Sequence, residues 1–84
     1  MGEHQHSEIA LITDARGRKL ARALVDLETP YEGHPEGWGG FIHAQIVSPE
    51  VVVKLQLSEG RAAVESVDSD TNRTRIRGLG PAPF

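Results

Sequence analysis

The sequence predicts an all-β, mainly antiparallel domain, a small barrel or sandwich of five or six strands. Three observations lead to this prediction. Apolar residues alternate with a period of two in several short runs, and turn-forming residues separate these runs about every 8–12 residues. The chain has 84 residues, which is enough for one small domain. We expect this domain to span residues 8–77, between a disordered N-terminus (1–7) and a Gly/Pro-rich C-terminal tail (78–84).

The first two elements differ in how firmly their patterns define them. Residues 8–13 fit a short strand, and Asp14-Ala15-Arg16-Gly17 fits a turn that ends it. Residues 18–28 fit a helix through Leu20, Ala23, Leu24 and Leu27, or a strand face through Ala21, Ala23, Val25 and Leu27. Because a glycine-closed turn precedes this segment and every other element is β, we favour the strand.

Four further strands follow. Residues 41–47 alternate apolar and polar side chains up to Pro49, which cannot donate to a β-ladder. Residues 51–57 place Val51, Val53, Leu55 and Leu57 on one face, and residues 61–67 fit the second strand of a hairpin. A three-residue loop would pair Leu57 with Arg61; a two-residue loop would pair Leu57 with Ala62 and Leu55 with Val64. After a turn at residues 68–72, residues 73–77 place Thr74 and Ile76 inward and three arginines outward.

Composition excludes several classes of protein. Without cysteine, the chain has no disulfides, no thiolate metal sites and no cysteine nucleophile. Its polar N-terminus and the lack of an apolar run of about 18 residues predict a cytoplasmic protein with no membrane partner. A chain this short buries only about 60–65% of its unfolded surface, so self-association would be an economical way to bury more.

The charge of −3 argues against a nucleic-acid partner, although seven of the nine basic residues lie in two clusters. One cluster contains Arg73, Arg75 and Arg77, a candidate anion-facing row. Residues 26–36 carry only acidic charges. We therefore expect the arginines to pair with these carboxylates within the chain.

No catalytic or metal-binding pattern stands out. Residues 68–72 resemble the start of a calcium loop, but Arg73 and Leu79 replace the glycine and glutamate that such a loop needs. His4 and His6 are too few for a structural metal site, and His43 reads as a partly exposed sheet residue. We expect no catalytic residues, no metal and no cofactor.

Residues 31–41 form the unusual segment, with four of the nine glycines and three of the four aromatic residues. Exposed aromatic side chains on loops are common binding anchors. The candidate ligand or partner contacts are Tyr31, His34, Glu36, Trp38 and Phe41. In the structural alternative, Trp38 folds back over a thin core.

Two stretches resemble a small uncharacterised β-domain of actinobacteria, which occurs alone or appended to flavin-dependent monooxygenases. They are Pro35-x-Gly37-Trp38-x-Gly40 and Gly78-x-Gly80-x-x-Pro83-Phe84, and the similarity in strand spacing extends over roughly residues 9–84. The sequence departs from that pattern at Phe41, where the family tends to have a basic residue, and it lacks the family's opening aromatic-Gly signature. The resemblance implies a β fold and no established activity.

These observations together predict a non-enzymatic binding or assembly module that self-associates, most simply as a homodimer. Val52 is a candidate dimer contact, through its side chain or through strand-edge pairing, because residues 51–53 are apolar on both faces. The alternatives are a ligand-binding domain that works with an oxidoreductase partner, and a small-barrel nucleic-acid binder.

Overall fold

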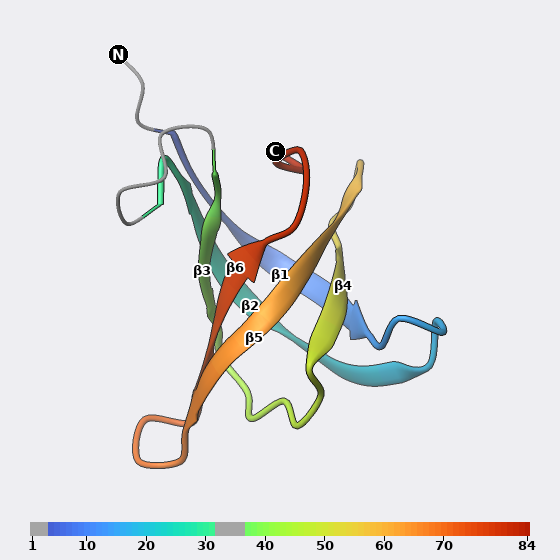
Figure 1. Cartoon of the computed structure of the whole chain (residues 1–84), viewed down its shortest axis with the longest axis vertical. Helices are drawn as coiled ribbons and strands as arrows, with labels where there is room; N and C mark the ends of the chain where they lie inside the picture. Colours follow the sequence, from blue (N-terminus) through green and yellow to red (C-terminus); the bar gives the residue numbers. More distant parts are fainter. Residues whose placement is uncertain (1–3, 32–36) are drawn as a thin grey trace.

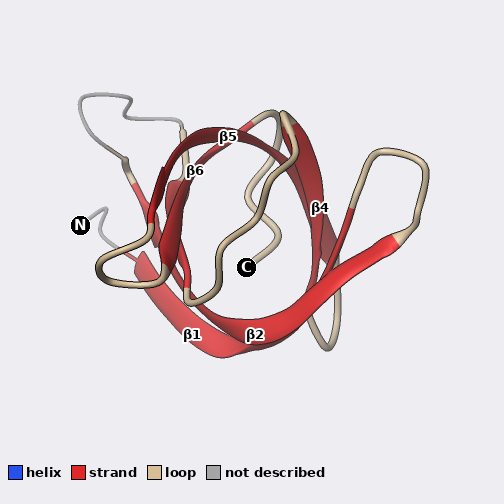
Figure 2. Cartoon of the chain, turned by 90° about the horizontal axis from the view of Figure 1, so that it is seen from below, coloured by secondary structure: helices blue, strands red, loops and turns tan. Residues whose placement is uncertain are grey.

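Six antiparallel strands close into a single barrel in the computed structural model, which describes residues 4–31 and 37–84 (Figure 1). The strands are β1 (His4–Thr13), β2 (Lys19–Thr29), β3 (Gly39–Ile42), β4 (Glu50–Lys54), β5 (Glu59–Asp68) and β6 (Arg73–Gly78). They follow one another around the barrel in the order β1-β2-β3-β6-β5-β4, and β4 returns to pair with β1. Figure 2 looks along this ring of strands. The all-β prediction is confirmed, as a barrel and not a sandwich.

Strand β2 settles the helix–strand alternative for residues 18–28. It pairs with β1 along nearly its whole length, and Val25 and Leu27 point into the core. The strand was favoured from its context, and the context decides because β2 pairs with β1 over residues 19–29 and with β3 over residues 25–28.

Strand β1 begins earlier than predicted. Residues 4–7 pair with Asp26–Thr29, so the expected disorder of residues 1–7 is wrong for these four; residues 1–3 lie outside the described residues. Their polar composition suggested a frayed end, but a long partner strand provides the missing backbone hydrogen bonds.

Side chains from all six strands fill the barrel, as they do in other small barrels. The largest fully buried apolar side chains come from every part of the chain: Ile12, Val25, Trp38, Ile42, Ile46, Val51, Val53 and Ile76. In β6 the alternation predicted for residues 73–77 is confirmed, since Thr74 and Ile76 are completely buried.

Strand β3 is shorter than the predicted strand over residues 41–47 and ends at Ile42. Thr74 organises the segment that follows. Its hydroxyl donates to the carbonyl oxygen of Ala44 (2.7 Å) and accepts from the backbone N–H of Ile46 (2.8 Å). A side chain from β6 thus takes the place of a continuing ladder, and Ile46 still reaches the core.

Both predicted registers of the β4–β5 hairpin are wrong. Val51 pairs with Ala62 and Val53 with Gly60, and the loop comprises the four residues 55–58. Leu57, expected to face inward, is 95% exposed. The reason is tertiary: a Cβ atom at position 60 would lie 2.9 Å from ring atoms of both Trp38 and Pro83, so the one glycine of this hairpin belongs in the ladder beneath them.

The turns predicted at residues 14–17 and 68–72 are confirmed, and in each the aspartate side chain accepts hydrogen bonds from the backbone. Asp14 Oδ1 accepts from the backbone N–H groups of Arg16 and Arg18, both at 2.9 Å. Asp68 Oδ1 accepts from those of Asp70 (2.9 Å) and Thr71 (3.3 Å). Residues 68–72 therefore form a hairpin turn whose carboxylate is used by the backbone.

Candidate functional site

Trp38 is a core residue, as the structural alternative for this residue expected, and its side chain is not exposed on the loop surface. It is 1% exposed, and its Nε1 donates to the carbonyl oxygen of Gly80 at 3.0 Å. A Cβ atom at position 78 would lie 2.1 Å from this nitrogen, so Gly78 provides the room for the indole. In a barrel with few large side chains, the largest one fills the interior.

Tyr31 is also buried rather than available to a partner. Its hydroxyl donates to Glu65 Oε1 (3.0 Å) and accepts from Arg75 Nε (2.6 Å). Burial is the main effect on this hydroxyl and raises the pKa of Tyr31 above its usual value. The hydroxyl of Tyr31 thus joins a side chain of β5, Glu65, to a side chain of β6, Arg75.

Phe41 is the predicted contact residue that the structure places at the surface; it is half-buried on the outer face of β3. The guanidinium of Arg73 lies 4.3 Å from the centre of its ring, and that of Arg75 lies 5.9 Å away. His34 and Glu36 lie outside the described residues.

The arginine row projects outward as predicted, and the structure places beside it a carboxylate that was not among the expected partners, Glu65; Glu32 and Glu36 of the predicted acidic segment lie outside the described residues. Arg75 and Arg77 both lie within ion-pair distance of Glu65, at 3.6 and 3.5 Å. Glu65 was not predicted as a partner, because the sequence does not reveal that it lies at a register shift beside β6. Charge compensation within the chain leaves this face less basic than its three arginines suggest.

A polar cluster that the sequence did not reveal joins β1, β2 and the end of β3. Asp26 Oδ1 accepts from the Ser7 hydroxyl, and Asp26 Oδ2 lies 2.5 Å from His43 Nε2. The hydrogen bond from Ser7 and then that from His43 hold the pKa of Asp26 below its usual value, against the effect of burial. This cluster could not be predicted, because the sequence does not show that the register of the β1–β2 hairpin places Ser7 opposite Asp26.

This cluster is not arranged for nucleophilic catalysis. In a serine–histidine–aspartate triad the histidine lies between the serine and the carboxylate and removes the serine proton. Here the carboxylate of Asp26 lies between Ser7 and His43. The arrangement instead ties three strands together on the outer face.

The opposite face of β1 contributes to a second polar group, at one end of the barrel. We call this end the barrel mouth and define it by His4, His6, Glu8, Trp38 and Phe84. His6 Nε2 lies 2.6 Å from Glu8 Oε1, and Glu8 Oε2 accepts from the backbone N–H of Gln56 at 2.7 Å. The bond with His6, followed by that from Gln56, lowers the pKa of Glu8.

The C-terminal tail folds across the barrel mouth, and in Figure 2 the chain end lies within the outline of the strand ring. The Phe84 ring stacks on His4 and His6, with centroids 5.4 and 5.8 Å away, and meets Trp38 edge-on at 6.2 Å. In the sequence, His4 and His6 and the tail lie at opposite ends of the chain, with no pattern that relates them. The structure brings them together.

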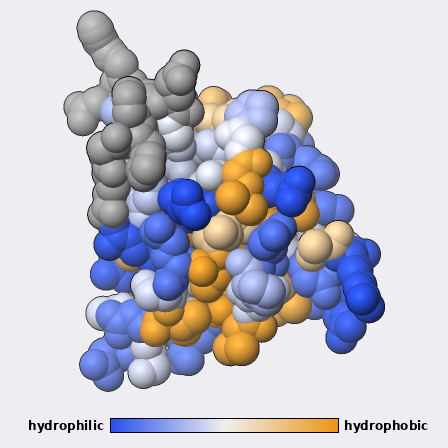
Figure 3. All heavy atoms as spheres, in the orientation of Figure 1, coloured by the Kyte–Doolittle hydropathy of each residue, from blue (hydrophilic) through white to orange (hydrophobic). Residues whose placement is uncertain are grey.

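Apolar surface also remains outside the barrel. Figure 3 shows the face where β5 and β6 lie in front, with apolar side chains among hydrophilic ones; the outer face of β1 and β2 lies on the far side of this view. The large hydrophobic residues that are exposed include Ile9, Leu20 and Leu24, which lie on β1 and β2.

Comparison with protein-family models, with curated proteins and with solved structures finds no match to this chain. Over residues 4–31 and 37–84, no helix is long and apolar enough to span a membrane. Within the same residues, no group of three or more His, Asp or Glu side chains is placed to hold a metal ion.

Proposed function

We propose that the protein is a non-catalytic binding and assembly module that forms a homodimer through the outer face of β1 and β2. One observation carries this proposal: Ile9 and Leu24 are directly opposite each other across the two strands and are 58% and 38% exposed. Their neighbours Ala10 and Val25 are buried, so Ile9 and Leu24 point away from the core. Leu20 extends this apolar face along β2.

The shape of this face supports a partner surface. A depression of about 520 Å³ lies beside Ile9, lined also by Leu11, Arg22 and Lys54. Apolar side chains next to a hollow rimmed by charged groups are typical of protein–protein interfaces. A side chain such as Leu24 from a second copy has the size and polarity to enter it.

Charge favours a second copy of the chain as that partner. On the outer face of β2, Arg22 lies two residues before Leu24, and Asp26 lies two residues after it. In a two-fold dimer centred near Leu24, the basic end of one copy faces the acidic end of the other. The face is therefore complementary to itself.

Barrel closure restricts how the copies meet. Strand-edge pairing through Val52, one of the two predicted routes, is wrong because β4 is paired with β1 on one side and β5 on the other. Val52 can therefore contact a second copy of the chain only through its side chain, which is half-buried. The proposed dimer accordingly uses faces of the sheet.

The two alternative functions receive less support. Glu65 neutralises much of the charge of Arg75 and Arg77, which weakens the case for nucleic-acid binding on β6. For the ligand-binding domain that works with an oxidoreductase partner, the predicted contacts Tyr31 and Trp38 are buried and Phe41 is half-buried, which weakens the case for a binding surface there.

Sedimentation tests the dimer. At about 10–100 µM, a range suited to modest interfaces, we expect the mass of two chains for the natural sequence and of one chain for Leu24→Lys. Leu57→Lys is the matched control: Leu57 is 95% exposed in the β4–β5 loop, so its replacement leaves the dimer intact. A natural chain that remains monomeric throughout, or a Leu24→Lys chain that still dimerises, would refute the proposal.

A further inference from the structure

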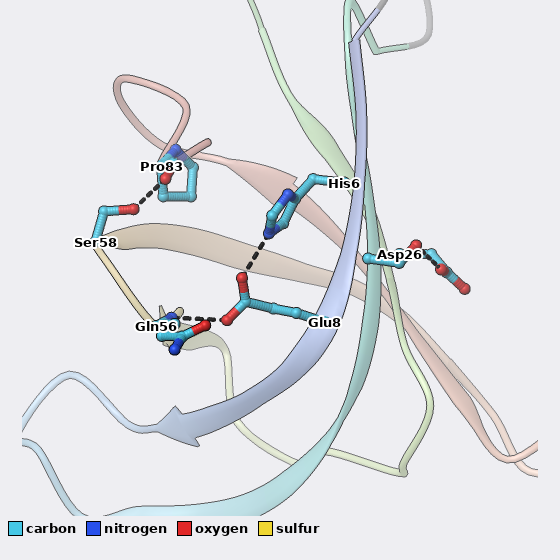
Figure 4. Close-up of polar contacts among 7 residues, drawn as sticks. His6, Glu8, Asp26, Gln56, Ser58 and Pro83 are labelled. Atoms are coloured by element: carbon cyan, nitrogen blue, oxygen red, sulfur yellow. Dashed lines mark hydrogen bonds and ion pairs between the residues drawn. The ribbon is translucent and has the colours of Figure 1, made fainter.

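Strand β1 presents polar side chains on the inner side of the barrel, where a small barrel usually has apolar ones. His6 is paired with Leu27 and Glu8 with Val25, and both partners are core residues. Directly opposite residues of an antiparallel pair project to the same side, so His6 and Glu8 face inward. Figure 4 shows both pointing to the side where the β4–β5 loop with Gln56 and Ser58 and the C-terminal tail with Pro83 lie, whereas Asp26 points away from that side.

Phe84 fills the space above these polar groups. Its ring is nearly parallel to those of His4 and His6, at an interplanar angle of 15° to each, and nearly perpendicular to that of Trp38, at 84°. Stacked and edge-to-face contacts are the two geometries that aromatic rings prefer. The barrel mouth thus offers one planar ring contacts with three others.

The segment that carries Phe84 is held by apolar contacts, with Ala82 and Phe84 packed against the core, more than by hydrogen bonds. Within the described structure, residues 81–84 make one hydrogen bond, from the hydroxyl of Ser58 to the carbonyl oxygen of Pro83. Pro81 and Pro83 have no N–H to donate. A pocket of about 610 Å³ lies between the tail and Ser58–Arg61, so the tail is not packed tightly on all sides.

Gly80 has the properties of a hinge for this segment. Its φ of 146° is rare for residues with a side chain, and a Cβ atom there would meet nothing within 4 Å. Its carbonyl oxygen accepts the bond from Trp38, which fixes the chain up to this point. Rotation after Gly80 would move the Phe84 ring while leaving β6 and the indole in place.

We propose that the barrel mouth is a binding site for a small planar aromatic molecule that carries a hydrogen-bond donor, and that Phe84 occupies it as a built-in competitor. The ring of the ligand takes the position of the Phe84 ring on His4, His6 and Trp38. Its donor adds a hydrogen bond to the carboxylate of Glu8, which already interacts with His6 and Gln56. The tail then swings away at Gly80, so binding is coupled to tail release.

Benzamidine is a suitable probe, because it combines a planar ring with an amidinium group that donates to carboxylates. The indole N–H of Trp38 is a convenient reporter, since the chain has one tryptophan and its indole signal needs no further assignment. We expect Phe84→Ala to bind benzamidine at least about tenfold more tightly than the natural chain in an NMR titration, because the competing ring is gone. Phe41→Ala, which removes the other phenylalanine, leaves the affinity unchanged.

Two comparisons identify the chemistry. Cyclohexanecarboxamidine has the same charge without the aromatic ring, and we expect it to bind Phe84→Ala at least about tenfold more weakly than benzamidine. Adding Glu8→Gln to Phe84→Ala removes the charged acceptor and lowers benzamidine affinity by a similar factor.

Three results would overturn this inference: equal benzamidine affinity with and without Phe84, equal affinity for the aromatic and saturated amidines, or a Phe84→Ala chain that does not fold. The last would make Phe84 part of the core. Glu8→Gln in the natural chain retains the tail contacts and should fold normally. Its benzamidine affinity, compared with that of the natural chain, tests the role of Glu8 without removing Phe84.

Discussion

Trp38 contributes more to the stability of this barrel than any surface contact considered above. Its indole is almost completely buried, donates to Gly80 and contacts the ring of Phe84. We expect Trp38→Ala to lower the free energy of unfolding by about 3–5 kcal/mol, the usual cost of a large cavity. Urea denaturation measures this loss, which is comparable with the total stability of many small domains.

Phe41→Ala is the control for that measurement, because Phe41 is an aromatic residue that is only half-buried. Its loss should cost about 1–2 kcal/mol, from less apolar burial and a weaker cation–π contact with Arg73. Equal costs for the two substitutions would contradict the assignment of Trp38 to the core.

Asp26 makes stability depend on pH. Its pKa is lowered in the folded chain, so its contribution is fully present above the unfolded pKa of about 4. That contribution is lost as the pH falls through the lower, folded pKa. We expect the natural chain to exceed Asp26→Asn in stability at about pH 6 and the difference to shrink by about pH 2.5.

Chemical denaturation at the two pH values checks the effect of Asp26. Asp70→Asn, a substitution at an exposed turn residue, serves as the control and should show little pH-dependent difference from the natural chain. A difference for Asp26→Asn that is constant over this range would mean that the carboxylate is not held in its charged form by Ser7 and His43.

At the scale of elements, β5 and β6 are joined on the outside by Glu65. This carboxylate accepts from Tyr31 and lies beside Arg75 and Arg77. After burial and the opposing effect of Arg75, its hydrogen bond and negative charge also raise the pKa of Tyr31. Replacing Glu65 should therefore lower that pKa, while burial keeps it above the usual value.

Because the chain has one tyrosine, absorbance titration of the phenol measures this pKa directly. We expect a lower tyrosine pKa in Glu65→Ala than in the natural chain. Glu59→Ala, which removes an exposed carboxylate at the start of β5, should leave it unchanged. An unaltered titration in Glu65→Ala would show that the Tyr31–Glu65 hydrogen bond does not persist in solution.

On the scale of the whole molecule, the barrel closes where β1 pairs with β4, and we call this short pairing the β1–β4 seam. Three residue pairs join β1 to β4, whereas β1 and β2 are paired from His4 to Thr13. Local opening requires less free energy where fewer contacts hold two elements together. We expect amide hydrogens that bridge β1 and β4 to exchange with solvent faster than those in the middle of the β1–β2 ladder.

Hydrogen exchange followed by NMR provides this comparison. The ladder amides around Ala10 and Ala23 supply the internal reference, since both residues lie well inside the long hairpin. Slower exchange at the β1–β4 seam than at these positions would show that closure is the most stable part of the barrel.

The sequence by itself determined the local features. The period-two alternation of residues 73–77, the Asx turns at Asp14 and Asp68 and the all-β class each depend on neighbouring residues. The outward position of the arginines followed from the same alternation. Phe41 was likewise placed on a strand next to a glycine-rich segment, and that prediction was correct.

Tertiary structure decided the side-chain contacts that form only when the six strands close into a barrel. The indole of Trp38 lies inside because Gly60 and Gly78 leave space for it on two other strands. Asp26 meets His43, and Phe84 meets His6, across long stretches of sequence. No local pattern encodes these meetings, because they depend on the register and curvature that the six strands acquire only when the last of them pairs with the first.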